Sequence, residues 1–259
     1  MRSLLGALSC AGLLLVAAPP AVADGSAPPT IAAQSAATAG NTRPLAGRTV
    51  VVDPGHQLGN SRHLRETTVL VGDGAGGRKA CNTTGTATDA GYPEATFAWQ
   101  VAVAVRDRLR RLGATVLMTR TENSVEEWGP CVDRRGRFGN VGADLKLSIH
   151  GDGSVAGNRG FHVIVGTRPG ERAASDRYAV LTRDALLGAG FSRSNYVGGG
   201  SGLDTRGDLG TLNWCRIPTV MVELGNMRDP ADAARMTSPA GQRAYAMALA
   251  EGARRFLAP

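Results

Sequence analysis

Hydrophobic runs and amphipathic stretches alternate along the chain from Leu45 onward. Short runs rich in β-branched residues predict strands, and longer stretches with helical periodicity predict helices. The predicted strands cover residues 48–53, 114–120, 144–149, 161–165 and 219–223. The predicted helices cover residues 93–112, 134–141, 172–187 and 239–257. This alternation predicts a single α/β domain, in which a mainly parallel central sheet is flanked by helices on both faces.

Two polar, glycine-rich segments interrupt the alternation. Residues 57–92 predict a long structureless loop, and residues 196–210 predict a second glycine-rich loop. A structureless loop as long as the first is unusual inside a compact domain and more often functional than not. Residues 57–92 are therefore expected to have a functional role.

The first residues predict a cleaved export signal. A positive start at Met1-Arg2 precedes an apolar stretch over residues 4–18 and a small-residue cleavage site at residues 21–23. We therefore assign residues 1–23 as a signal peptide, 24–44 as a flexible Ala/Thr/Pro-rich tether and 45–259 as the folded domain. The apolar stretch is shorter than the roughly 20 residues that a membrane span needs. No transmembrane anchor is expected after cleavage, and the mature protein is expected to be secreted, periplasmic or located in the cell wall.

Three cysteines follow the predicted cleavage site: Cys81, Cys131 and Cys215. An oxidising compartment permits a disulfide, and an odd count leaves one thiol unpaired. Cys81 and Cys131 lie in polar loops and are the expected pair. Cys215 precedes an apolar strand, so we expect it to be a buried free thiol.

The formal net charge is +7, and Lys79 and Lys146 are the only lysines among the basic residues. The chain has no basic patch interleaved with aromatic residues, and it starts with an export signal, so no nucleic-acid partner is expected. An anionic wall polymer is a better partner for a basic exported protein.

Four imidazole or carboxylate side chains lie where an apolar run ends or a helix begins: His56, Glu94, His150 and Glu223. In an open α/β sheet the carboxyl ends of the strands meet at one edge, where ligands bind. Simpler explanations exist, because a histidine in a turn is often a surface residue and a glutamate at a helix start is favoured by the helix dipole. Glu223 is harder to explain in that way, since a carboxylate that ends a buried strand needs a partner or a function.

Two histidines and one glutamate with an open fourth position form a catalytic zinc set, beside which a second glutamate can act as base. His63, in a polar loop, and His162, inside a strand pattern, have weaker claims as ligands. The sequence lacks His-Glu-x-x-His and Gly-x-Ser-x-Gly, which argues against a helix-borne metalloprotease site and a nucleophile elbow. Cys215 precedes a strand instead of following one, so a cysteine nucleophile is not expected. The sequence predicts a zinc hydrolase.

Four sequence blocks carry a resemblance to a known family: Val-Val-Asp-Pro-Gly-His56, Pro-Glu94-Ala-Thr, Ala-Asp-Leu-Lys-Leu-Ser-Ile-His150 and Pro-Thr-Val-Met-Val-Glu223-Leu-Gly-Asn. From about Leu45 to the end, their order and spacing resemble the zinc-dependent N-acetylmuramoyl-L-alanine amidases, in particular the mycobacterial type without a wall-binding module. The resemblance implies one Zn²⁺ held by His56, Glu94 and His150, with Glu223 as catalytic base. It also implies a twisted, mainly parallel sheet in one α/β domain.

The sequence departs from the usual family pattern in two places. His150 is followed by Gly-Asp where Ala-Asn is commoner, and the segment 57–92 is long and carries Cys81. Neither departure removes an implied zinc ligand or the implied base.

The resulting interpretation is an exported, monomeric peptidoglycan hydrolase. It would act on peptidoglycan or muropeptides and cleave the amide between the lactyl group of N-acetylmuramic acid and the L-alanine of the stem peptide. Another exported zinc peptidase, such as a carboxypeptidase acting within the stem peptide, and a non-catalytic wall-binding protein remain alternatives. Arg120, Arg134 and Arg135 either bind acidic groups of the stem peptide or form structural ion pairs; we favour ion pairs.

Overall fold

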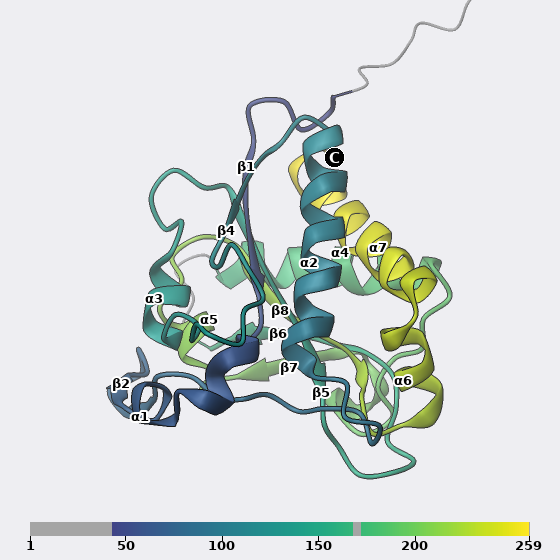
Figure 1. Ribbon diagram of the computed structural model, residues 1–259. Coiled ribbons are helices and arrows are strands. Elements are labelled where there is room, and N and C mark those ends of the chain that lie inside the picture. The colour runs from purple at the N-terminus through teal and green to yellow at the C-terminus, as the bar shows by residue number, and fades with distance from the viewer. Residues whose placement is uncertain (1–42, 168–171, 259) are drawn as a thin grey trace, which may run out of the picture. The chain divides into compact units, whose positions relative to one another are not determined.

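A six-stranded sheet lies at the centre of the computed structural model, which describes residues 43–167 and 172–258 (Figure 1). The predicted signal peptide and nearly all of the predicted tether lie outside these residues. In spatial order the strands are β4 (Thr115–Met118), β1 (Thr49–Pro54), β5 (Leu145–Asp152), β8 (Thr219–Asn226), β6 (His162–Gly166) and β7 (Leu203–Arg206). Every neighbouring pair is parallel except β6–β8, which is antiparallel. The predicted mainly parallel α/β fold is confirmed.

Helices cover both faces of this sheet. Figure 1 shows α2 (Glu94–Arg111) and α7 (Pro239–Leu257) on one side of the sheet. These two helices pack against each other, and α7 also packs against α4 (Arg172–Gly188). The short helices α3 (Val132–Arg137) and α5 (Gly210–Asn213) pack together on the other side. The remaining helix, α6 (Pro230–Thr237), is capped by Asp229 and leads into α7.

The main core lies between the sheet and the three long helices. On α2 the side chains of Phe97, Val101 and Val105 recur every four residues and are fully buried, which is the apolar stripe that predicted this helix. The strands β1, β5 and β8 are buried almost throughout, as expected for central parallel strands covered on both faces. A smaller apolar cluster of Ile164, Leu212 and Met221 lies on the opposite face of the sheet.

The structure corrects the sequence analysis in the two segments that were predicted to be loops. Residues 57–92 contain η1 (Leu58–Arg62), α1 (Leu64–Thr67) and a hairpin of β2 (Leu70–Gly72) and β3 (Arg78–Ala80). Residues 196–210 contain the short helix η2 (Gly198–Gly200) and the edge strand β7. These elements are too short to produce a readable periodicity. The predicted helix over 134–141 is shorter, because Phe138 is extended and Gly139 has a φ of 81°.

The predicted disulfide between Cys81 and Cys131 is confirmed, with a Cα–Cα distance of 4.2 Å. It ties the exit of β3 to the start of α3. Cys215 is free and buried, as predicted, and its sulfur lies 2.7 Å from the Thr219 hydroxyl. Within the described part of the chain, none of the helices has both the length and the apolar character of a membrane span.

Removal of the disulfide is expected to destabilise the fold. The bridge closes a loop with a sequence separation of 50, for which the chain-entropy model gives about 4 kcal/mol. The variant Cys81→Ser/Cys131→Ser should therefore lose about 3–5 kcal/mol of unfolding free energy in urea denaturation. Cys215→Ser is the matched control that retains the bridge. An unchanged urea midpoint in the double variant would show that the bridge does not constrain the unfolded chain.

Candidate metal and catalytic site

Three of the four predicted site residues meet at the carboxyl edge of the sheet. His56 follows β1, His150 lies near the end of β5, and Glu94 is the first residue of α2. Because β1 and β5 are neighbouring parallel strands, their ends lie side by side. The turn at Gly55 is tight: a Cβ atom there would lie 2.5 Å from the His150 ring. His56 itself has a φ of 55°, the only positive φ of a non-glycine residue in the described chain.

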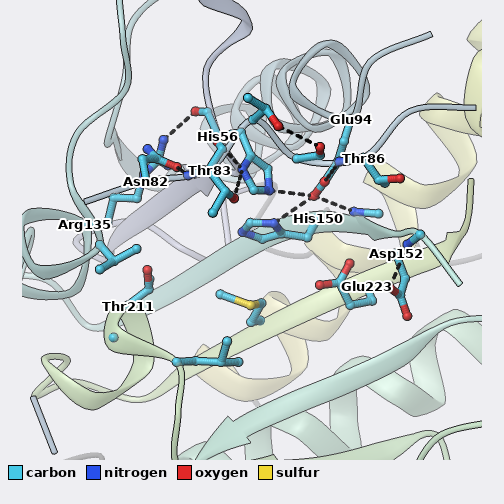
Figure 2. Close-up of a pocket in the computed structure, with 18 of the residues that line it drawn as sticks. His56, Asn82, Thr83, Thr86, Glu94, Arg135, His150, Asp152, Thr211 and Glu223 are labelled. Atoms are coloured by element: carbon cyan, nitrogen blue, oxygen red, sulfur yellow. Dashed lines mark hydrogen bonds and ion pairs between the residues drawn. The ribbon is translucent and has the colours of Figure 1, made fainter. Parts of the chain in front are cut away.

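The side chains converge on the Glu94 carboxylate. Glu94 Oε1 lies 3.1 Å from His56 Nε2 and 2.9 Å from His150 Nδ1 (Figure 2). The potential ligand atoms of the three residues all lie within 4.8 Å of one another. Across residues 43–167 and 172–258 this is the one group of three or more His, Cys, Asp or Glu side chains with such a geometry. The three donors suit a metal ion, because imidazole nitrogens and a carboxylate oxygen are zinc ligands.

Hydrogen bonds fix the orientation of these side chains. His56 Nδ1 lies 3.0 Å from the carbonyl oxygen of Thr83, which can only accept, so Nδ1 donates this bond and Nε2 is the ring nitrogen that faces Glu94. Glu94 Oε2 accepts from the amide of Thr86 at 2.9 Å, and Oε1 accepts from the amide of Gly151 at 3.2 Å. Such support of ligands by their neighbours is typical of metal sites.

The electrostatics of Glu94 also favour its charged form. Burial alone would raise its pKa, but the charges and hydrogen bonds of His56 and His150 hold the pKa of Glu94 well below its usual range. Conversely, burial disfavours a charged His56, yet the Glu94 carboxylate raises the His56 pKa. The negative charge of the Glu94 carboxylate therefore favours a cation between His56, Glu94 and His150.

Glu223 lies beside this group and is not part of it. It stands on β8 directly across from His150 in the parallel register, so the two side chains lie on the same face of the sheet. Both residues line a cavity of about 480 Å³ together with His56 and Glu94. Glu223 Oε2 is buried and has no hydrogen-bond partner among the described residues. Burial, and then the charges of Glu94 and Asp152, raise the pKa of Glu223 well above its ordinary value. A carboxylate oxygen in this state is suited to accept a proton from a molecule in the cavity.

A buried ion pair supports the His56 turn. Arg135 on α3 donates to the Asp53 carboxylate at 2.7 Å, to the Pro54 carbonyl at 2.7 Å and to the His56 carbonyl. Arg120 donates to the Gly55 carbonyl at 3.2 Å and so also supports this turn. Arg135 thus forms the expected structural ion pair, whereas Arg120 donates to backbone carbonyl and side-chain amide oxygens. Arg134 is exposed.

Loss of this ion pair is expected to destabilise the protein. Burial would raise the pKa of Asp53, but Arg135 and two hydroxyl donors lower it to about 2. Arg135→Met should cost about 3–5 kcal/mol of unfolding free energy at neutral pH, because it leaves a buried charge without a partner. A carboxyl whose folded pKa is depressed contributes stability above its unfolded pKa of about 4, and this contribution disappears as the pH falls toward 2.

Urea denaturation of Arg135→Met and of the exposed control Arg134→Met tests this prediction. The difference between wild type and Arg135→Met should narrow as the pH is lowered from about 4 to about 2. A difference that stays constant over that range would mean that Asp53 is not the partner whose charge matters.

The two remaining histidines lie outside the His56–Glu94–His150 group, which we call the metal-type group. His63 Nε2 lies 3.0 Å from the Glu126 carbonyl, and His162 is buried with its ring against Tyr196. Sequence reasoning did not single out Thr83 and Thr86, whose backbones orient His56 and Glu94. The unusual length of the 57–92 segment was the only sequence signal for their role.

The comparisons with known proteins agree with this site. Residues 50–255 match the family model described as N-acetylmuramoyl-L-alanine amidase. The chain is 37% identical over 251 residues to the N-acetylmuramoyl-L-alanine amidase Rv3717 of Mycobacterium tuberculosis, covering 95% of this chain and 96% of the relative. Among solved structures, it is similar to the N-acetylmuramyl-L-alanine amidases Ami1 of Mycobacterium smegmatis (39% identity, TM-score 0.78) and Mycobacterium abscessus (42% identity, TM-score 0.77). Both matches cover 82% of this chain, and they cover 98% and 100% of the respective structures.

Proposed function

Because the chain belongs to the N-acetylmuramoyl-L-alanine amidase family, we propose that it cleaves the amide between the lactyl group of N-acetylmuramic acid and the L-alanine of the stem peptide. The observation that carries this proposal is the His56–Glu94–His150 group beside the unpartnered oxygen of Glu223, all in one cavity. The substrate would be peptidoglycan or its muropeptide fragments.

His56, Glu94 and His150 would hold one Zn²⁺ and leave one coordination position open to the cavity. When bound there, zinc supplies Lewis-acid polarisation of the scissile carbonyl and makes a water molecule more acidic. Two of the three side chains are already oriented for this task, because Thr83 fixes the His56 ring, and Thr86 and Gly151 fix the Glu94 carboxylate.

Glu223 would be the general base. Its Oε2 takes a proton from the attacking water and later returns it to the nitrogen of the leaving L-alanine. A raised pKa favours the second step, because burial makes Glu223 hold the proton more readily than an ordinary carboxyl until the nitrogen takes it. Glu223 and His150 are register partners on the adjacent strands β8 and β5, and both side chains line the cavity.

The products distinguish this function from the two alternatives. An amidase releases the intact stem peptide and leaves lactyl-bearing muramic acid in the glycan, whereas a carboxypeptidase releases D-amino acids. A wall-binding protein releases nothing, and it has no need of a base at Glu223. Mass spectrometry of muropeptides digested with zinc-loaded protein should find intact stem peptide. Free D-amino acids, or undigested muropeptides, would contradict the proposal.

Export is part of the same proposal. The disulfide is compatible with an oxidising compartment, and a peptidoglycan substrate lies outside the cytoplasm. The mature protein would be a secreted, periplasmic or wall-located monomer that begins near Asp24. Amino-terminal sequencing of exported protein checks the cleavage position.

A further inference from the structure

Two acidic residues and one basic residue of the cavity lie on different sides of the two site histidines. Figure 2 shows Asp152 and Glu223 on one side of His56 and His150, and Arg135 on the other. The cavity also has Lys79 in its lining. The Arg135 charge is neutralised by the buried Asp53 carboxylate at 2.7 Å. Among the described residues, Lys79 is therefore the lysine or arginine of the cavity lining that has no ion pair.

The environment of Lys79 leaves its ammonium group available to a ligand. Lys79 Nζ donates to the backbone carbonyl of Asp208 at 2.6 Å, and a lysine ammonium has three donors. In the described parts of the chain it forms no ion pair. The two acids whose pKa it lowers are engaged elsewhere: Asp73 accepts from the amides of its own turn, and Asp208 forms a two-point ion pair with Arg206.

The position of Lys79 is fixed relative to the reacting centre. It lies on β3, and the chain continues along the cavity to Thr83, whose carbonyl holds His56. Four residues of extended chain span at most about 14 Å. The disulfide of Cys81 anchors this path, and Asn82 Nδ2 donates to the Pro130 carbonyl at 2.9 Å. Lys79 and Thr83 therefore line one cavity with their Cα atoms no farther apart than this distance.

We propose that Lys79 is a specificity-determining residue that binds a carboxylate of the leaving stem peptide. The proposal rests on the amidase function and adds a direction to it: the peptide lies toward Lys79, and the glycan lies toward Asp152. The carboxylates of Asp152 and Glu223 would repel an acidic peptide, whereas a neutral sugar offers hydroxyl donors to them.

A pair of substrates tests this assignment. Muramoyl stem peptides that differ only at the second residue, with the α-carboxyl of glutamate either free or converted to the amide, isolate one charge. The zinc-loaded wild type should prefer the free acid by about 10- to 100-fold in kcat/KM. A hydrogen bond to a charged group usually has an effect of this size on kcat/KM. Lys79→Met should lose that preference through a slower reaction with the acid, while its kcat/KM on the amide stays near the wild-type value.

Two further variants separate charge recognition from structural damage. Lys79→Arg keeps the charge and should keep most of the preference. Arg78→Met removes a positive charge from the neighbouring, exposed position on β3, whose side chain points to the other face of the hairpin, and should keep the full preference. Equal kcat/KM of the wild type on the two substrates would overturn the proposal, as would an equal loss on both in Lys79→Met. If the wild type releases stem peptide from neither substrate, the amidase function itself is wrong.

Discussion

Replacing Glu223 by Gln is expected to remove nearly all release of stem peptide while the fold and the zinc site remain. The amide has the shape of the carboxylate but cannot accept the proton of the attacking water. Loss of a general base typically costs about 10²- to 10⁴-fold in rate. Because Glu223 is outside the His56–Glu94–His150 group, the zinc content should stay at that of the wild type.

Steady-state kinetics and metal analysis of the same preparation check this prediction. Glu127→Gln is the matched control, since this glutamate is exposed and does not line the cavity. If Glu223→Gln loses zinc, Glu223 is a ligand and the role of Glu94 must be reassigned. Near-full activity in the variant would mean that another group takes the proton.

Replacing either site histidine by Ala is expected to abolish zinc binding. His56→Ala and His150→Ala each leave two donors of the three, and they also leave the buried Glu94 carboxylate without one of its two imidazole partners. Elemental analysis should find about one zinc per chain in the wild type and close to none in either variant. His63→Ala is the control, because His63 lies outside the group. Full zinc occupancy in either site variant would remove that histidine from the ligand set.

The sequence predicted the metal-type group because the group follows from topology. Once β1 and β5 are recognised as parallel strands, the side chains that follow them must come to one edge of the sheet, whatever their distance along the chain. His56 and His150 are 94 positions apart, yet each ends an apolar run. The helix start at Glu94 was visible from Pro93, and in the structure Pro93 is the residue immediately before α2.

The supporting contacts could not be predicted in the same way. The ion pair of Asp53 and Arg135 joins residues 82 positions apart, so the sequence suggested a structural ion pair for Arg135 but did not identify its partner. Thr83 acts through its backbone carbonyl, which every residue has. The short hairpin of β2 and β3 has too few residues for a pattern, and its position depends on contacts such as the bond from the Trp214 indole to the Gly72 carbonyl at 2.8 Å. Such features depend on packing and not on local propensity.

The position of bound zinc tests the account most directly. A crystal structure of zinc-loaded protein, with anomalous data collected at the zinc edge, locates the ion without reference to activity. The account predicts a single strong peak at about 2.0–2.2 Å from His56 Nε2, His150 Nδ1 and a Glu94 carboxylate oxygen, with Glu223 outside bonding distance. A peak elsewhere, or one bonded to Glu223, would contradict it.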